Sequence, residues 1–165
     1  MLDYGAGTGL LAETLAAGVG ALTLAEPSAG MRGQARAKVT DGRLPATTRI
    51  WELDLSRDPV PDERFDVVVS VLTLHHIHEL DRVLAALATM LVPGGRLCIV
   101  DLEEEDGTFH DLESGFDGHH GFARDVLTGL LHAAGLVDVE VDRLDTLVKD
   151  DRAYHRFLAV AQRPR

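Results

Sequence analysis

Three glycines at alternating positions, directly behind an acidic residue, form the group in this 165-residue sequence best suited to hold a ligand. The run is Asp3-Tyr4-Gly5-Ala6-Gly7-Thr8-Gly9, followed by Leu10-Leu11-Ala12. Glycine suits a backbone that must adopt left-handed conformations and let a ligand approach closely. The pattern predicts a strand ending near Tyr4 that turns sharply into a helix over residues 10–17, with a ligand bound at the turn.

Dinucleotides are one of two classes of ligand that bind at such a turn, and the spacing of the glycines separates dinucleotide turns from the other class. A dinucleotide turn has the order G-x-G-x-x-G, and its third glycine would stand where this chain has Leu10. Glu26 ends the next predicted strand and can accept hydrogen bonds from ribose hydroxyls in either class. A nicotinamide-dependent oxidoreductase therefore stays an alternative, which Leu10 disfavours.

Histidines are the second group with chemical potential, and six of the eight gather in two parts of the chain. They are His75, His76, His78, His110, His119 and His120. Zinc is disfavoured, because no pair has i, i+4 spacing inside a predicted helix and no cysteine accompanies them, so we predict no metal site. A histidine can instead deprotonate a hydroxyl or orient a substrate. We predict His76 and His120 as catalytic candidates, since their segments should lie on the ligand side of the sheet; histidines that only cap loops or close the pocket are the alternative.

The elements that must position these residues alternate between strand and helix. Apolar patterns predict strands over residues 1–4, 21–25, 48–53, 65–72, 96–102, 137–142 and 154–161. Helices are predicted over residues 10–17, 28–39, 80–91 and 123–134, with Ser28 as an N-cap, Gly135 as a C-terminal cap and Pro93-Gly94-Gly95 as the stop of the third helix. This alternation predicts an α/β fold with a largely parallel sheet, whose ligands bind at the carboxyl ends of the strands. Residues 103–121 form a long polar connection, which we expect to face the substrate.

Composition narrows the class of protein and the kinds of partner. With 45% hydrophobic and 26% charged residues, residues 1–165 suit one globular domain, and no apolar run approaches the roughly 18 residues of a membrane span. The net charge of −11 and the acidic runs at 101–106 and 150–151 would repel nucleic acid. Cys98 is a lone cysteine, so no intramolecular disulfide forms. We expect a cytoplasmic protein that binds a small molecule, with no nucleic acid or membrane partner.

The run from Leu2 to Gly9 resembles the nucleotide loop of class I S-adenosylmethionine-dependent methyltransferases. Four further segments continue the resemblance in the same order: Glu26-Pro27-Ser28 with Met31, Asp54-Leu55, Phe65–Ser70 with Leu74-His75-His76, and Leu91–Leu97. His120-Gly121-Phe122, followed by Leu131–Gly135, is similar to the substrate-side loop and helix of a small-molecule subgroup.

The resemblance implies a fold and a cofactor. The fold is a Rossmann-like three-layer sandwich, with a mostly parallel seven-stranded sheet, an antiparallel last strand and helices on both faces. The implied cofactor, S-adenosylmethionine, carries no phosphate, which agrees with the lack of Lys and Arg in residues 1–12. The implied cofactor-binding residues are Asp3, Gly5, Ala6, Gly7, Thr8, Gly9, Glu26, Met31, Asp54, Leu55 and Val71.

Individual roles follow from the same resemblance. Asp3 is available to the cofactor's amino group, Glu26 to the ribose, and Asp54-Leu55 to the adenine. The methionine carboxylate can lie near the helix amino terminus at Gly9, where free amides favour an anion. Asp54 also stands in an ordinary polar loop, and Val71 can simply pack or offer backbone groups.

The implied activity is transfer of a methyl group from S-adenosylmethionine to a small-molecule acceptor. A second interpretation is a methyltransferase-like remnant that binds the cofactor without turnover. Relatives carry a helical segment before the glycine turn, whereas only Met1 to Tyr4 precede it here, so we expect a chain shortened at its amino terminus and lacking that cap helix. The acceptor atom and the oligomeric state stay open.

Overall fold

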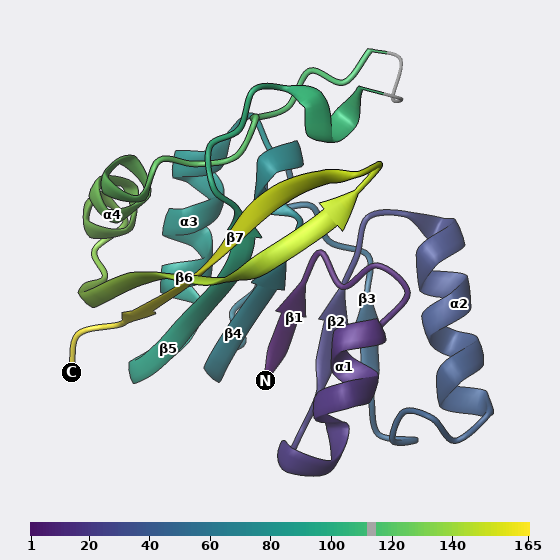
Figure 1. The fold of residues 1–165 in the computed structure, drawn as a ribbon. Helices are drawn as coiled ribbons and strands as arrows, with labels where there is room; N and C mark the ends of the chain where they lie inside the picture. Colours follow the sequence, from purple (N-terminus) through teal and green to yellow (C-terminus); the bar gives the residue numbers. More distant parts are fainter. Residues whose placement is uncertain (112–114) are drawn as a thin grey trace.

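In the computed structural model, which describes residues 1–111 and 115–165, seven strands of the described chain form one sheet (Figure 1). The strands are β1 (Leu2–Tyr4), β2 (Thr23–Ala25), β3 (Arg49–Trp51), β4 (Phe65–Val71), β5 (Leu91–Leu102), β6 (Val137–Lys149) and β7 (Arg152–Gln162). Their order is β3-β2-β1-β4-β5-β7-β6. The strands from β3 to β5 pair in parallel, while β7 runs antiparallel to β5 and β6. The predicted mostly parallel sheet with an antiparallel last strand is confirmed.

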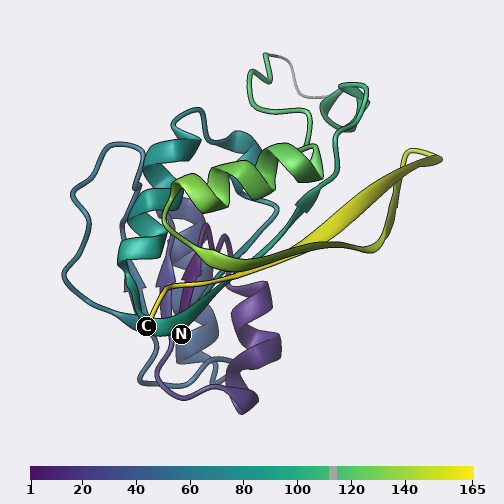
Figure 2. The same ribbon diagram turned by 90° about the vertical axis from the view of Figure 1, so that its left-hand side faces the viewer.

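Helices cover both faces of the sheet, which confirms the predicted three layers. They are α1 (Leu10–Leu15), α2 (Ala29–Thr40), α3 (Leu80–Thr89) and α4 (Arg124–Ala133), with the short helices η1 (Ala16–Gly18), η2 (Leu74–His76) and η3 (Thr108–His110). Figure 2 shows α3 and α4 on one side of the sheet and α1 on the other. Neighbouring residues of a strand point to opposite faces. Accordingly, Leu24 packs with Ala12 of α1 and Ala35 of α2, whereas Ala25 belongs to the core shared with α3 and α4.

The entry to β5 corrects one prediction from the sequence. The expected helix through Leu91, stopped by Pro93-Gly94-Gly95, ends instead at Thr89, and Leu91 already pairs with Phe65 of β4. The glycines lie inside β5 because the strand bulges there: a Cβ on Gly95 would stand 2.9 Å from the Val92 carbonyl oxygen. Leu91 is fully buried, so its apolar character fits a helix face and a strand equally well.

The ends of the other elements follow local chemistry. The Ser28 hydroxyl accepts a hydrogen bond from the Met31 amide at 3.4 Å, so the predicted N-cap of α2 is confirmed. Gly135, with φ of 84°, follows the last turn of α4 as predicted. Strand β6 continues past its predicted end at Asp142 to Lys149, because a register shift near Arg143 interrupts the apolar alternation while pairing with β7 resumes. Among the described helices, none combines the length and apolarity that crossing a membrane requires.

The strand order creates the position of the site. The chain passes outward from β1 to β2 and β3, then returns to place β4 on the other side of β1. Such a reversal leaves a crevice beyond the carboxyl ends of the central strands. Parallel pairing sets Tyr4 level with Ala25, and Asp3 level with Val69. The glycine turn, Glu26 and the segment after Val71 therefore leave the sheet side by side.

Candidate functional site

A cleft of about 920 Å³ opens at this edge of the sheet, a volume typical of small-molecule sites. Of the residues predicted to bind the cofactor, those that line it are Asp3, Gly5, Ala6, Gly7, Thr8, Glu26, Met31, Asp54 and Val71. The structure also places His76 on its wall, but not Gly9, Leu55 or His120 among the described lining residues. The cleft therefore gathers most of the residues selected from the sequence.

The three glycines of the turn serve two different purposes. All have positive φ, of 71° at Gly5, 54° at Gly7 and 75° at Gly9. A Cβ on Gly5 would stand 2.2 Å from a methyl carbon of Thr73, and one on Gly9 would press against Leu24 at 3.2 Å. Around Gly7 the nearest atom is the Met31 sulfur at 3.8 Å. Gly5 and Gly9 thus let the turn pack against its neighbours, and Gly7 leaves room in the cleft.

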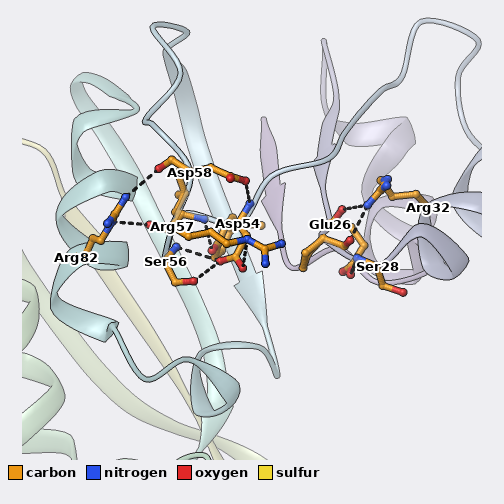
Figure 3. Close-up of polar contacts among 11 residues, drawn as sticks. Glu26, Ser28, Arg32, Asp54, Ser56, Arg57, Asp58 and Arg82 are labelled. Atoms are coloured by element: carbon orange, nitrogen blue, oxygen red, sulfur yellow. Dashed lines mark hydrogen bonds and ion pairs between the residues drawn. The ribbon is translucent and has the colours of Figure 1, made fainter.

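Glu26 braces the turn from the end of β2. Its two carboxylate oxygens accept hydrogen bonds from the amides of Gly7 at 2.9 Å and Ser28 at 2.8 Å. Arg32 of α2 donates to the Glu26 and Pro27 carbonyl oxygens at 2.9 and 2.7 Å, which fixes the strand end (Figure 3). Arg32 also pairs with the exposed Glu52 carboxylate at 2.5 Å. Sequence reasoning missed Arg32, because two of these three partners are backbone oxygens. Each Glu26 oxygen retains a lone pair for a ligand hydroxyl.

Asp3 places a buried carboxyl group with a raised pKa on the wall of the cleft. It is 2% exposed, and its Oδ2 has no hydrogen-bond partner in the part of the chain that the structure describes. Burial, together with the negative charge of Glu26, raises the pKa of the Asp3 carboxyl to about 7. A buried carboxylate is stable only when a cation or a hydrogen-bond donor compensates its lost hydration. This wall of the cleft therefore fits a ligand that carries a positive group.

The loop after β3 forms the far wall and is held by its own polar contacts. The Asp54 carboxylate accepts from the Ser56 amide at 3.0 Å and pairs with Arg57 at 3.2 Å, as Figure 3 shows. Leu55 is fully buried, and its amide donates to the Tyr4 hydroxyl at 3.1 Å. The Asp54 side chain thus shapes the wall, and Leu55 supports it from beneath.

The segment after β4 supplies the opposite wall, which sequence reasoning only partly identified. Leu72 has φ of 50°, a conformation that costs a non-glycine residue roughly 1–3 kcal/mol and often marks a functional site. This turn carries Thr73 to the glycine loop, where its hydroxyl donates to the Gly5 carbonyl at 3.2 Å. Ile77 and His78 follow His76 along the wall.

The second catalytic candidate lies elsewhere in the described structure. The side chain of His120 is half exposed, and its Nδ1 lies 3.4 Å from a Glu105 carboxylate oxygen. This pair belongs to the 103–121 connection, of which residues 112–114 lie outside the described residues. His76 therefore adjoins the cleft, whereas His120 does not line it.

A switch-point cleft with a glycine turn, a strand-end carboxylate and seven strands in this order is the arrangement of a Rossmann-like α/β protein, in which this crevice is the expected ligand site. The sequence profile of the methyltransferase domain matches residues 2–99, and the chain belongs to this family.

Relatives and solved structures agree with that assignment. The chain is 30% identical to an uncharacterized methyltransferase of Geobacillus kaustophilus over 150 residues, which cover 82% of this chain and 67% of that protein. It is 30% identical to the ubiquinone/menaquinone biosynthesis C-methyltransferase of Cellvibrio japonicus over 107 residues, 63% of this chain and 43% of that protein. Its fold matches phosphoethanolamine N-methyltransferase 2 of Haemonchus contortus, solved with S-adenosyl-L-methionine, with a TM-score of 0.83 at 17% identity, covering 100% of this chain and 48% of the other. The chain thus spans only part of the length of these proteins.

Proposed function

We propose that this chain binds S-adenosyl-L-methionine in the cleft and transfers its methyl group to a small-molecule acceptor. The observation that carries the proposal is the buried Asp3 carboxylate, whose Oδ2 has no partner among the described residues and which lies at the glycine turn beside Glu26. A cofactor with an ammonium group and ribose hydroxyls compensates both carboxylates at once.

The residues present fit that cofactor. Asp3 would accept from the ammonium group, Glu26 would bind the ribose hydroxyls, and the wall at Asp54 would lie against the adenine. The bound cofactor supplies a methyl group on a positively charged sulfur, which needs little help to leave. The chain's own task is mainly positioning, since holding two reactants in line replaces a bimolecular encounter with an intramolecular step.

The acceptor would enter along the wall formed by Thr73, His76 and Ile77. His76 is exposed there and can orient an acceptor or take its proton. A small acceptor is supported by the size of the cleft, and a nucleic acid is disfavoured by the net charge of −11. A cytoplasmic location, and a chain without a membrane or nucleic acid partner, stay predictions.

The test combines binding with turnover. Calorimetry should show that S-adenosylmethionine binds, and Glu26→Gln should weaken it, whereas Glu140→Gln on exposed β6 should leave the affinity unchanged. Formation of S-adenosylhomocysteine is then followed across acceptors that carry hydroxyl, thiol, amine or acidic carbon groups. Binding of S-adenosylmethionine with no turnover on all of these acceptors would support the remnant. Binding of NAD more tightly than S-adenosylmethionine would support the oxidoreductase.

A further inference from the structure

Three histidines from two distant segments meet beside the acceptor wall. One ring nitrogen from each of His75, His76 and His110 lies within 4.8 Å of the other two. The ring centroids of His75 and His76 are 4.1 Å apart, and those of His75 and His110 are 5.2 Å apart. His75 and His110 are buried, while His76 is exposed and lines the cleft. Helical spacing and the lack of cysteines disfavoured zinc in the sequence, whereas these three histidines come from the short helices η2 and η3.

The carboxylate of Asp101 fixes the chemistry of His75. Asp101 is fully buried at the end of β5 and accepts from the amides of Leu74 at 3.0 Å and Leu102 at 2.8 Å. Its Oδ1 lies 2.5 Å from His75 Nδ1. Since the carboxylate is an acceptor, Nδ1 carries a proton, and in the neutral imidazole Nε2 then keeps its lone pair. Metal-binding histidines almost always donate their other ring N–H to an outer partner, which is a carboxylate, a backbone carbonyl or water.

The free nitrogen of His75 points to a ligand. The side chain is 2% exposed, and within residues 1–111 and 115–165 its Nε2 has no hydrogen-bond partner. A buried acceptor without a partner costs about 1–3 kcal/mol. A metal ion at Nε2 would compensate this loss, and nitrogens of the other two histidines stand close enough to share it.

The surrounding chain holds the cluster in place. The His119 amide donates to the His75 carbonyl at 2.7 Å, and a His119 ring nitrogen lies 3.0 Å from the Ile77 carbonyl. Phe116 stacks on His110 with ring centroids 3.8 Å apart. Gly118 lies so close to His75 that a Cβ there would stand 2.3 Å from the His75 carbonyl. The described part of the 103–121 connection thus presses His110 against η2.

We propose that His75 Nε2, His76 and His110 bind a transition-metal dication of the zinc class, with Asp101 as the outer partner of His75. Neutral imidazoles favour Zn²⁺, Co²⁺, Ni²⁺ or Cu²⁺ over Mg²⁺ and Ca²⁺, which prefer oxygen ligands. Tetrahedral zinc separates nitrogen ligands by about 3.3 Å, so the cluster must contract, and the exposed His76 can supply this movement. Three protein ligands leave a fourth position for water or for an acceptor atom. That use in acceptor binding rests on the proposed function; metal binding itself does not.

The test uses the full chain without a histidine tag, stripped with a chelator and titrated with Co²⁺ and then Zn²⁺. We expect one equivalent of Co²⁺ with the visible absorption of a tetrahedral site, displaced by Zn²⁺. His76→Ala removes an exposed side chain and should weaken Co²⁺ binding at least about tenfold without loss of folding, and Asp101→Asn should weaken it roughly 10–100-fold. His155→Ala, at an exposed position of β7, is the matched control and should bind as the unchanged chain does.

Two results would overturn the site. One is Co²⁺ binding no tighter than in the folded triple variant H75A/H76A/H110A. The other is equal weakening by His76→Ala and His155→Ala, which means scattered surface binding. Gly7→Val separates this site from the cofactor site, because it should remove binding of S-adenosylmethionine and leave the Co²⁺ spectrum unchanged.

Discussion

The buried carboxylate of Asp3 should make the stability of the cofactor-free chain depend on pH. Burial first, and the charge of Glu26 second, raise the pKa of Asp3 from 3.8 to about 7. The folded state therefore binds this proton more tightly than the unfolded state, so stability falls as the pH rises from about 4 to about 7. At about 1.4 kcal/mol per pKa unit, the full cost of ionising Asp3 is about 4 kcal/mol.

Replacement by Asn isolates this effect, since it keeps the shape and removes the titration. Urea unfolding of both proteins at about pH 5 and pH 8 gives the difference in their free energies of unfolding. Histidines titrate in both proteins and cancel in that difference. We expect the stability advantage of Asp3→Asn to grow by about 3 kcal/mol between these pH values. An advantage that stays constant over this range would refute the assignment of an anomalous carboxyl to Asp3.

Cofactor binding should reverse the shift. An ammonium group beside Asp3 stabilises its charged form, so binding at about pH 6 should release close to one proton. Calorimetry in buffers of different ionisation enthalpy counts that proton. The Asp3→Asn variant should bind more weakly and release none of it; an equal proton count in both proteins would show that the cofactor does not contact Asp3.

Three further substitutions test the frame of the site. Gly7→Val places a branched residue at φ of 54°, which should cost about 1–2 kcal/mol of stability. It should abolish cofactor binding in calorimetry, while circular dichroism still shows the sheet. Gly33→Val, at a position of α2 with open space around it, is the control and should retain binding. Arg32→Met leaves the carbonyls at the end of β2 without their donor and should lower the free energy of urea unfolding by about 2–4 kcal/mol. Arg36→Met, at an exposed position of the same helix, is the control, and an equal effect of this variant would contradict the role of Arg32. Tyr4→Phe leaves the buried Leu55 amide without its acceptor and should cost about 1–3 kcal/mol in the same assay, so unchanged stability would show that this bond is dispensable.

Local signals in the sequence carried the prediction of the fold and of one side of the cleft. The glycine turn, the Ser28 cap and the apolar run of β4 each depend on neighbours within a few residues, and the structure contains all three. Leu91 was misassigned, because burial alone does not separate a helix face from a buried strand.

Contacts between distant segments could not be predicted in this way. Tyr4 acts through a backbone amide, and two of the three partners of Arg32 are backbone carbonyls, which leave no trace in residue type. The meeting of His110 with His75 depends on the path of the 103–121 connection, whose polar sequence has no helical or strand period. A single sequence indicates which residues can bind a metal, but the fold decides which of them meet.

The energetics at Asp3 bear on the choice between an active methyltransferase and a remnant. A buried carboxylate without a partner among the described residues destabilises the free chain as it ionises, and the stability advantage of Asn in its place grows as the pH rises above about 4. That cost is recovered only when a cation binds, so the arrangement suits a chain that holds its cofactor. Turnover depends instead on the opposite wall, where strained Leu72 brings Thr73 and then His76 toward the cleft. If the chain is a remnant that binds S-adenosylmethionine without turnover, binding should still release the proton of Asp3. Substitutions at His76 should then leave the rate of S-adenosylhomocysteine formation at background, as in the unchanged chain.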